Sequence, residues 1–476
     1  MALGICSVSL WQPWLERDPK QVALNHAGQT LTWQALDSQV AHYAKALREQ
    51  GVRSGEVVTL VGKNHLPTVL WFLACTQVGA LCAFVAPQPL ARLQEKLATL
   101  YAEQSPKHLW LAPSCALSEE DIAKLNAHRL SLPDERDESV GGEKVSSQFS
   151  CEQLATLIFT SGSTGTPKAV THTHQQHLAS ARGLLNKFAF TESDSWLLSL
   201  PLYHISGVAI LYRWLAVGAT LKIGTGDLQN DIAGVTHASL VPTQLKRLLD
   251  SSSPLTLKRV LLGGSHIPVE LAQMAATRGI DTWLGYGMTE AASTVTAKRV
   301  DGLAGNGELL DHRELRLVDG RIFIAGKTLA QGYYRQGQLV PLTNEQGWFD
   351  SKDLGRWQGN NLLIDGRADN LFISGGENVH CEEIEAVLNQ HPHVQVAIVI
   401  PVQDSEFGAR PVAVIRSEAE WCQAIGDTWC QAKLEKFKWP IMYFLLPDAL
   451  LDGGIKVSRA AVKAWLAANQ TQFTPL

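Results

Sequence analysis

Apolar and polar residues alternate along this chain in two distinct patterns. Short apolar runs, typical of buried strands, are separated by stretches in which apolar residues recur every three or four positions, as on a helix face. Strands are predicted at Val57–Val61, Thr156–Thr160, Trp196–Leu200 and Arg259–Leu262, and helices at Thr32–Gln50, His174–Phe188 and Pro242–Asp250. Thr173 and Gln176 form a capping-box pattern at the start of the second helix. The alternation predicts an α/β fold.

One apolar stretch, Val69–Ala86, is close to the length of a membrane span. It is interrupted by Thr76 and Gln77, and Gly79 stands where a helix would end. We therefore predict a buried helix followed by a buried strand, with no membrane span.

The pattern changes after about residue 365. Glu382–Gln390 has apolar residues at helical spacing and three glutamates near its start, which favour the helix dipole. Val394–Val402 and Val412–Arg416 are predicted strands, and Ala419–Phe437 is a predicted helix. These elements suffice for a small α+β domain of roughly a hundred residues.

Composition sets broader limits. At 476 residues the chain is too long for one core, and its net charge of −5 disfavours nucleic acid or an anionic membrane as the main partner. The eight cysteines show no CxxC pair and are expected to be reduced thiols. Met1–Leu10 does not resemble a signal peptide, so we expect a cytoplasmic protein. Ser131–Ser150 is polar and without a periodic pattern, which predicts an exposed loop.

The most informative segment is Thr156–Val170, in which an apolar strand leads into a loop rich in glycine and hydroxyl groups. Glycines let the backbone approach a ligand, and hydroxyl, N–H and ammonium groups donate hydrogen bonds to an anion. Pro167 and Ala169 flank the lysine where a P-loop needs Gly and Ser or Thr, so the loop is of another type. A Ser/Gly linker is the alternative. We predict a phosphate-binding loop whose donors include Thr160, Ser161, Ser163, Thr164 and Lys168.

Two further polar clusters follow apolar runs, at Gly263–His266 and Gly285–Glu290. Loops at the ends of strands in an α/β sheet are common ligand sites. The second cluster, GYGMTE, combines an aromatic ring, a hydroxyl and a carboxylate, which suit a nucleobase, a phosphate and Mg²⁺. A Gly-Tyr-Gly turn followed by the start of a helix is the alternative interpretation.

These clusters and three downstream segments occur in one order: TSGSTGTPK, GYGMTE, GWFDSKDLGRW, DGRADNLFISGGENVHCEEIE and GGIKVSR. Together they resemble the adenylate-forming superfamily, which includes acyl- and aryl-CoA ligases, peptide-synthetase adenylation domains and beetle luciferases. The resemblance extends from Leu154 to Arg459. It implies a large N-terminal α/β domain of packed sheets and helices, residues 1–368, and a small mobile α+β C-terminal domain, residues 369–476.

The resemblance also assigns roles in binding ATP and Mg²⁺. The loop residues Ser161, Ser163, Thr164 and Lys168 would hold the β- and γ-phosphates, and Gly263, Gly264 and Tyr286 would border the adenine. Thr289 would contact the α-phosphate and Glu290 the Mg²⁺. Asp353 would bind the ribose hydroxyls and Arg367 would lie near the ribose and phosphates; a turn residue is the alternative for Asp353.

By the same resemblance, Lys456 matches the mobile catalytic lysine, although Ile455 separates it from Gly454 where many members have Gly-Lys. A surface lysine is the alternative. Asp369 matches the hinge between the domains. The implied reaction has two steps: a carboxylate attacks ATP to give an acyl-adenylate and pyrophosphate, then the small domain rotates, brings Ser374–Asn378 to the site and admits CoA.

The acid pocket in this family lies between the positions of His204 and Thr294. A structural histidine is the alternative for His204. Arg213 is a lone guanidinium in an apolar helix, which is costly to bury without an anion, and snorkelling to the surface is its alternative. If Arg213 faces the pocket, the acid carries a second carboxylate, which Ser239 and Thr294 would help to bind.

We therefore expect a CoA ligase for an aryl dicarboxylic acid. The alternatives are a CoA ligase for another acid, an adenylation enzyme that loads a carrier protein, and a non-catalytic relative. The last is disfavoured because Lys168, Glu290, Asp353 and Lys456 are all present. The expected partners are the small molecules ATP, CoA and a carboxylic acid, and the chain is a possible homo-oligomer.

Overall fold

We describe the fold from a computed structural model of residues 9–115, 117–133, 149–160, 167–251, 253–263, 267–374, 377–431, 433–452, 456–470 and 474–475. Two compact units emerge. The large unit contains the described residues from 9 to 160, Pro167–Glu314 and Ile324–Phe349. The small unit contains Leu315–Phe323 and the described part of Asp350–Leu476. The predicted hinge at Asp369 does not coincide with a boundary between these two units, and its role as a hinge remains a prediction.

Two sheets of mainly parallel strands organise the large unit. Within the described residues, one sheet has the strand order β15 (Glu308–Leu309), β14 (Ser293–Arg299), β13 (Asp281–Met288), β12 (Arg259–Leu262), β11 (His237–Leu240), β9 (Ser195–Leu198), β10 (Thr220–Ile223), β1 (Val22–His26) and β2 (Gln29–Thr32). The other has the order β19 (Gln338–Val340), β18 (Gly332–Arg335), β8 (Lys168–Thr173), β7 (Leu154–Thr160), β4 (Leu81–Val85), β3 (Val57–Val61), β5 (His108–Leu111) and β6 (His128–Arg129).

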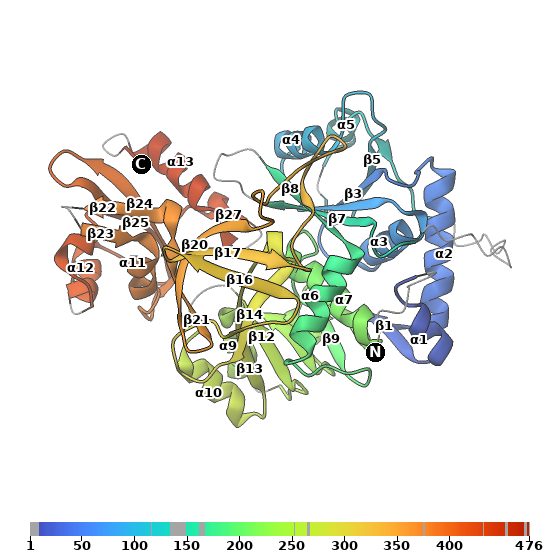
Figure 1. Cartoon of the computed structure of the whole chain (residues 1–476), viewed down its shortest axis with the longest axis horizontal. Coiled ribbons are helices and arrows are strands. Elements are labelled where there is room, and N and C mark those ends of the chain that lie inside the picture. The colour runs from blue at the N-terminus through green and yellow to red at the C-terminus, as the bar shows by residue number, and fades with distance from the viewer. Residues whose placement is uncertain are drawn as a thin grey trace. The chain divides into compact units, whose positions relative to one another are not determined.

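The helices of the large unit are α1 (Gln12–Arg17), α2 (Trp33–Glu49), α3 (Leu66–Val78), α4 (Leu90–Leu100), α5 (Glu119–Ala123), α6 (His174–Leu185), α7 (Ile205–Val217), α8 (Leu228–Asp231), α9 (Pro242–Asp250) and α10 (Val269–Thr277). Helices α6 and α7 lie side by side, and α6 contacts both β8 and β14, one strand from each sheet (Figure 1). The main apolar core surrounds α2, α3, α6 and α7. This packing places α7 deep inside the unit.

The local sequence signals agree with the structure. The predicted strand Val57–Val61 and helix Pro242–Asp250 have the expected bounds. The capping box at the start of α6 is formed, with the Thr173 hydroxyl accepting from the Gln176 N–H and the Gln176 side chain accepting from the Thr173 N–H. The apolar stretch from Val69 is the buried helix α3, ended by Gly79 in a left-handed conformation, and the buried strand β4. Among the described residues, no helix is long and apolar enough to cross a lipid bilayer.

The small unit contains a mainly antiparallel sheet packed against helices, in which only the described pair β25 and β26 is parallel. Its strands run in the order β23 (Glu377–His380), β22 (Leu371–Ser374), β25 (Gly408–Ser417) and β24 (Val394–Asp404), and β26 (Tyr443–Leu445) pairs with β25. Helices α11 (Cys381–Leu388) and α13 (Arg459–Asn469) pack against β24. A further sheet, most of whose residues belong to the small unit, has the order β16 (Arg313–Val318), β17 (Arg321–Gly326), β20 (Phe349–Gln358) and β21 (Asn361–Arg367).

One predicted element of this unit was wrong in extent. The expected helix at Ala419–Phe437 is only α12 (Gln423–Gln431), followed by a short 3₁₀ turn at Lys436–Lys438. Both Lys433 and Leu434 donate their N–H groups to the Cys430 carbonyl, which closes a turn after the helix. The predicted loop Ser131–Ser150 lies largely outside the described residues.

Candidate active site

The predicted phosphate-binding loop joins two antiparallel strands, β7 and β8. Thr160 at the end of β7 pairs with Lys168 at the start of β8, so the strands hold the ends of the loop together. Both ends of the segment therefore belong to paired strands, and its role in binding phosphate remains a prediction. The predicted donors Ser161, Ser163 and Thr164 lie outside the described residues.

Lys168 is connected to Glu290 through a tyrosine that the sequence analysis missed. The Lys168 ammonium lies 5.2 Å from the centre of the Tyr333 ring, and the Tyr333 hydroxyl donates to Glu290 Oε1 at 3.4 Å. Burial and the nearby Glu290 carboxylate raise the pKa of Tyr333, so the hydroxyl keeps its proton at neutral pH. Strand β18 brings Tyr333 beside β8, with Tyr333 opposite Val170. The contact of Tyr333 with Lys168 and Glu290 thus depends on the pairing of β18 with β8, two strands that are far apart in the sequence.

The segment Gly285–Glu290 is a strand end followed by a short 3₁₀ helix, η1 (Thr289–Ala291), in place of a turn and an α-helix. A Cβ atom at Gly287 would lie 1.9 Å from the Ser293 carbonyl oxygen, so this glycine allows β14 to approach. Tyr286 is half-buried between the two glycines, opposite Thr296. Thr289 and Glu290 are the first two residues of η1.

Of the two glycines that were predicted to border the adenine, Gly263 and Gly264, only the first is among the described residues. Gly263 directly follows the buried strand β12, and a Cβ atom built on it would meet nothing within 4 Å. Gly264 lies outside the described residues. The open space at Gly263 is compatible with a ligand at the end of β12.

His204 caps the N-terminal end of α7 without a side-chain hydrogen bond to the helix. Its ring is 4.9 Å from that of Tyr203. The segment before it is held by Asn64, another residue that the sequence analysis missed. Asn64 Nδ2 donates to the carbonyls of Leu198 and Leu200 at 3.1 and 2.8 Å, and the Leu202 N–H donates to Asn64 Oδ1 at 2.9 Å. Asn64 therefore fixes the backbone that leads to His204.

Arg213 is buried in the large unit, with only 2% of its surface exposed. Its Nη2 donates to Thr294 Oγ1 at 3.5 Å, and its guanidinium lies 5.1 Å from the centre of the Trp196 ring. Within the described residues no carboxylate forms an ion pair with Arg213, and its Nε has no hydrogen-bond partner. Burial, together with the nearby Arg313, lowers the pKa of Arg213 to about 9, so it remains charged at neutral pH.

The snorkelling alternative for Arg213 was wrong, because α7 has no exposed residue along which a side chain reaches solvent. The structure brings Arg213 and Thr294 together as predicted. Ser239, on β11 of the sheet that also contains Thr294, is buried as well, and its hydroxyl has no hydrogen-bond partner among the described residues. Buried polar atoms without partners are costly, and a polar ligand would satisfy them.

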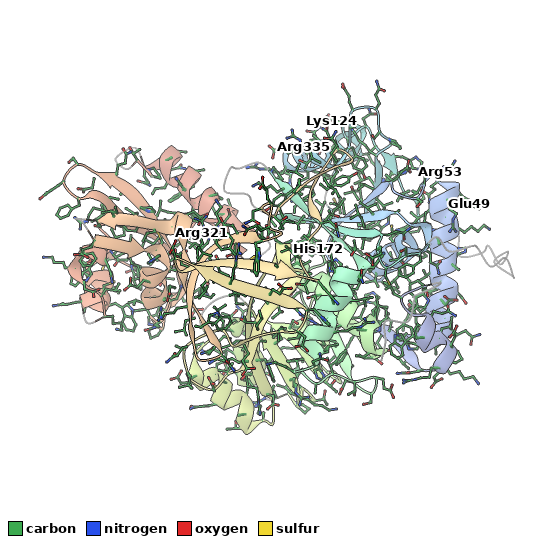
Figure 2. All side chains as sticks on the ribbon, viewed as in Figure 1. Glu49, Arg53, Lys124, His172, Arg321 and Arg335 are labelled. Atoms are coloured by element: carbon green, nitrogen blue, oxygen red, sulfur yellow. The ribbon has the colours of Figure 1, made fainter. Side chains whose placement is uncertain are left out.

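A cluster of buried histidines packs around Tyr212, the residue that precedes Arg213 on α7. His174 Nδ1 hydrogen-bonds with the Tyr212 hydroxyl at 2.8 Å, and the His177 ring stacks on the Tyr212 ring with centroids 4.4 Å apart. His172 on β8 lies inside the large unit, 4.8 Å from the His177 ring (Figure 2). Burial lowers the pKa of His172 and of His174 to about 3, so both are neutral at physiological pH.

In the small unit, Asp353 and Arg367 face each other across the hairpin of β20 and β21. Arg367 Nη1 donates to Asp353 Oδ1 at 3.3 Å, and its Nε and Nη2 form a two-point contact with Asp369 at 2.8 and 2.9 Å. Asp353 is only 7% exposed, and the bidentate pair lowers the pKa of Asp369. The predicted ribose, phosphate and hinge residues therefore form one connected group.

Lys456 begins the short strand β28 (Lys456–Val457), which pairs with β27 (Leu451–Asp452). Its side chain lies outside the described residues. Three residues later, Arg459 Nη1 and Nη2 donate to the two carboxylate oxygens of Glu385 at 2.7 and 3.0 Å, and Nη2 also donates to Glu382 at 3.3 Å. Arg459 thereby ties the start of α13 to α11 and anchors the strand that carries Lys456.

Comparison with known proteins agrees with this geometry. The profile of the AMP-binding enzyme family matches residues 11–334. A 2-succinylbenzoate–CoA ligase from Salmonella typhimurium is 43% identical over 465 residues, which cover 96% of this chain and 98% of that protein. The chain therefore belongs to the AMP-binding enzyme family, and the predicted resemblance to adenylate-forming enzymes and the α/β fold class are confirmed.

Two solved structures are similar over nearly their whole length. A variant of E. coli MenE with bound OSB-AMS has a TM-score of 0.85 and 39% identity, covering 98% of this chain and all of that one (100%). O-succinylbenzoate coenzyme A synthetase (MenE) from Bacillus subtilis, in complex with ATP and a magnesium ion, has a TM-score of 0.81 and 26% identity, covering 95% and 98% of the two chains.

Proposed function

We propose that this protein is an ATP-dependent 2-succinylbenzoate–CoA ligase, an acid–thiol ligase that forms 2-succinylbenzoyl-CoA, AMP and pyrophosphate. The choice of acid depends on Arg213. Its buried guanidinium donates a hydrogen bond to Thr294 and forms no ion pair with a carboxylate of the described residues. A charge in this setting needs an anion to balance it. The similarity to 2-succinylbenzoate–CoA ligases supports the same assignment.

The acid has two carboxylates with different roles. The succinyl carboxylate is activated, while the ring carboxylate is free to meet Arg213, whose planar fork matches the two carboxylate oxygens. Ser239, with a buried hydroxyl that lacks a partner, and Thr294 supply further hydrogen bonds. His204 lines the entrance to this pocket. The product would serve menaquinone biosynthesis.

In the first half-reaction, the succinyl carboxylate oxygen attacks the α-phosphorus of ATP, and pyrophosphate leaves. Thr160, Ser161, Ser163, Thr164 and Lys168 hold the β- and γ-phosphates. Thr289 contacts the α-phosphate, while Gly263, Gly264 and Tyr286 border the adenine. Lys456 stabilises the negative charge that moves between the carboxylate and the α-phosphate.

Glu290 fits a role in holding Mg²⁺. Its carboxylate provides the hard oxygen ligands that Mg²⁺ prefers, and it shares Tyr333 with Lys168: the Tyr333 hydroxyl donates to Glu290 Oε1 and the Tyr333 ring lies against the ammonium. Mg²⁺ is typically held by one or two carboxylates together with substrate phosphates, so a single glutamate suffices. The ion would neutralise part of the phosphate charge.

In the second half-reaction, the CoA thiol attacks the acyl carbonyl carbon and AMP leaves. We assign Asp369 as the hinge between a domain of residues 1–368 and a domain of residues 369–476, which changes orientation between the two steps. Asp353 binds the ribose hydroxyls, and Arg367 binds near the ribose and phosphates. The contacts of Arg367 with both aspartates support a link between nucleotide binding and the hinge.

The proposal is tested by measuring pyrophosphate release with 2-succinylbenzoate, benzoate, 4-coumarate and a fatty acid, each with and without CoA. We expect 2-succinylbenzoate to give the highest kcat/KM and a thioester product only when CoA is present. Preference for another acid would overturn the choice of substrate. Adenylate formation without transfer to CoA would favour a stand-alone enzyme that loads a carrier protein.

A further inference from the structure

We propose that Arg313 is a positioning residue of the acid site: it braces the turn before Thr294 and so holds Thr294 and Arg213 in place for the second carboxylate. This inference rests on the proposed function, because the second carboxylate belongs to the proposed substrate. Arg313 is 133 residues away in sequence from its main partner, Ser180, and no motif marks it.

Arg313 is a second buried guanidinium in the large unit, with 5% of its surface exposed. Its Nη2 donates to the Ser180 carbonyl at 3.0 Å and to the Ser180 hydroxyl at 2.8 Å, and its Nη1 donates to the Asp311 carbonyl at 2.7 Å. These acceptors are neutral, and within the described residues Arg313 forms no ion pair. Its geometry is therefore fixed by neutral acceptors, while the effect of burial exceeds that of the nearby Asp311 carboxylate and lowers the pKa of Arg313 to about 9.

The contact continues from Ser180 to the turn that leads into Thr294. The Ser180 hydroxyl donates to the Ala292 carbonyl at 2.5 Å. Ala292 and Ser293 have φ angles of 52° and 94°, in the left-handed region that residues with a Cβ atom rarely adopt. Such a backbone persists only when its surroundings hold it. Arg313, through Ser180, provides this support.

Thr294 is the next residue, and its hydroxyl accepts the hydrogen bond from Arg213 Nη2. A shift of this turn would move the group that orients Arg213. The path is therefore a chain of direct contacts from Arg313 to Ser180, to the turn, to Thr294 and to Arg213.

Gly183 on α6 leaves room for the Arg313 guanidinium, because glycine has no Cβ atom. A Cβ atom at Gly183 would lie 2.1 Å from Arg313 Nη1 and 2.3 Å from the Asp311 carbonyl oxygen. A helix interior favours alanine over glycine, so the absence of a side chain at this position fits the passage of the guanidinium.

The charge of Arg313, like its position, favours binding of the second carboxylate. It lies close enough to Arg213 to lower the pKa of Arg213, in addition to the effect of burial. Two neighbouring positive charges in a weakly polarisable interior repel one another and attract an anion strongly. This arrangement favours an acid with a second negative charge over one with a neutral tail.

The test compares two acids in wild type and Arg313→Met: 2-succinylbenzoate and 4-oxo-4-phenylbutanoate, which lacks the ring carboxylate. We expect kcat/KM for 2-succinylbenzoate to fall about tenfold or more, mainly through KM, while that for the monoacid changes less than about twofold. Arg53→Met is the matched control, since Arg53 is exposed and lies near Glu49 at the end of α2 (Figure 2). It should change neither value.

Equal losses for both acids in a folded Arg313→Met protein, or no loss for either, would overturn the inference. If Arg313→Met does not fold, Ser180→Ala takes its place, because it removes the hydroxyl link but keeps a helix-forming residue. It should lower kcat/KM about threefold for the diacid alone. A wild-type enzyme that does not use 2-succinylbenzoate would instead refute the proposed function, and the inference with it.

Discussion

Arg213 in the large unit is buried and the Arg459 side chain in the small unit is only 23% exposed, but the two guanidinium charges have opposite surroundings. Arg459 is surrounded by acceptors, including both carboxylate oxygens of Glu385. Arg213 contacts a threonine hydroxyl and an aromatic ring, and its Nε has no hydrogen-bond partner in the described parts of the chain. The first arrangement balances the charge within the fold, whereas the second leaves the charge without a counter-anion among the described residues. We infer that this difference separates a structural arginine from the arginine to which we assign the second carboxylate.

The largest effect is expected at Lys456, the cation in the small unit to which we assign a catalytic role. Lys456→Ala should lower the rate of adenylate formation by about 10²–10³-fold, the effect of removing one stabilising group from a developing charge. Thioester formation from preformed adenylate should be largely retained. Separate assays of the two half-reactions check this, and equal losses in both would refute the role of Lys456.

Arg459→Met should instead affect stability. It leaves the Glu385 carboxylate, whose pKa burial already raises, without its cation. We expect the free energy of unfolding to fall by about 3 kcal/mol. Chemical denaturation measures this change. The control is Arg416→Met, since Arg416 forms only an exposed pair with Asp448 at 3.7 Å and should contribute about 0–1 kcal/mol. Similar changes in the two variants would contradict the structural role of Arg459.

The buried histidines that pack around Tyr212 allow a pH test of the interior of the large unit. Because burial lowers the pKa of His174 to about 3, the unfolded chain binds more protons than the folded chain below the ordinary histidine pKa. Stability should therefore fall as pH drops below about 6.5, by about 2 kcal/mol for this residue at pH 5.

Denaturation of wild type and His174→Gln at pH 7.5 and pH 5.0 checks this contribution. The stability lost between the two pH values should be about 2 kcal/mol smaller in the variant, because glutamine does not titrate. Gln also retains the capacity to hydrogen-bond with Tyr212. The same loss in both proteins would show that His174 does not contribute to the pH dependence.

The smallest expected effect comes from Arg213→Lys, which keeps the charge but replaces a two-point contact with a single ammonium. We expect KM for 2-succinylbenzoate to rise about tenfold, which corresponds to about 1.4 kcal/mol. The free energy of unfolding should change little, in contrast to Arg459→Met. Steady-state kinetics and denaturation on the same protein test both statements, and an unchanged KM would remove the argument for a dicarboxylic acid.

Local signals in the sequence predicted much of this protein. The strand β3, the helix α9 and the capping box at Thr173 depend on neighbouring residues, so pattern and propensity were sufficient. The motifs also led to Lys168, Glu290 and the adenylate-forming family.

The residues that were missed depend on contacts between distant parts of the chain. Tyr333 lies 43 residues from Glu290, Asn64 lies 134 from Leu198, and Arg313 lies 133 from Ser180. None belongs to a recognisable pattern, because tertiary pairing alone brings each to its partner. The alternatives for Arg213 were left open for the same reason: its burial depends on packing around α7, which the helix sequence does not specify.

The burial of α7 on every side has a consequence for evolution. Arg213 is presented by a helix whose residues from Val208 to Leu215 are all buried, with Trp214 stacked on Trp33 of α2. Surface substitutions, which accumulate most easily, therefore leave the position of this arginine unchanged. A descendant that adopts a different acid must repack the interior, so substrate choice in this lineage should drift slowly while the surface diverges.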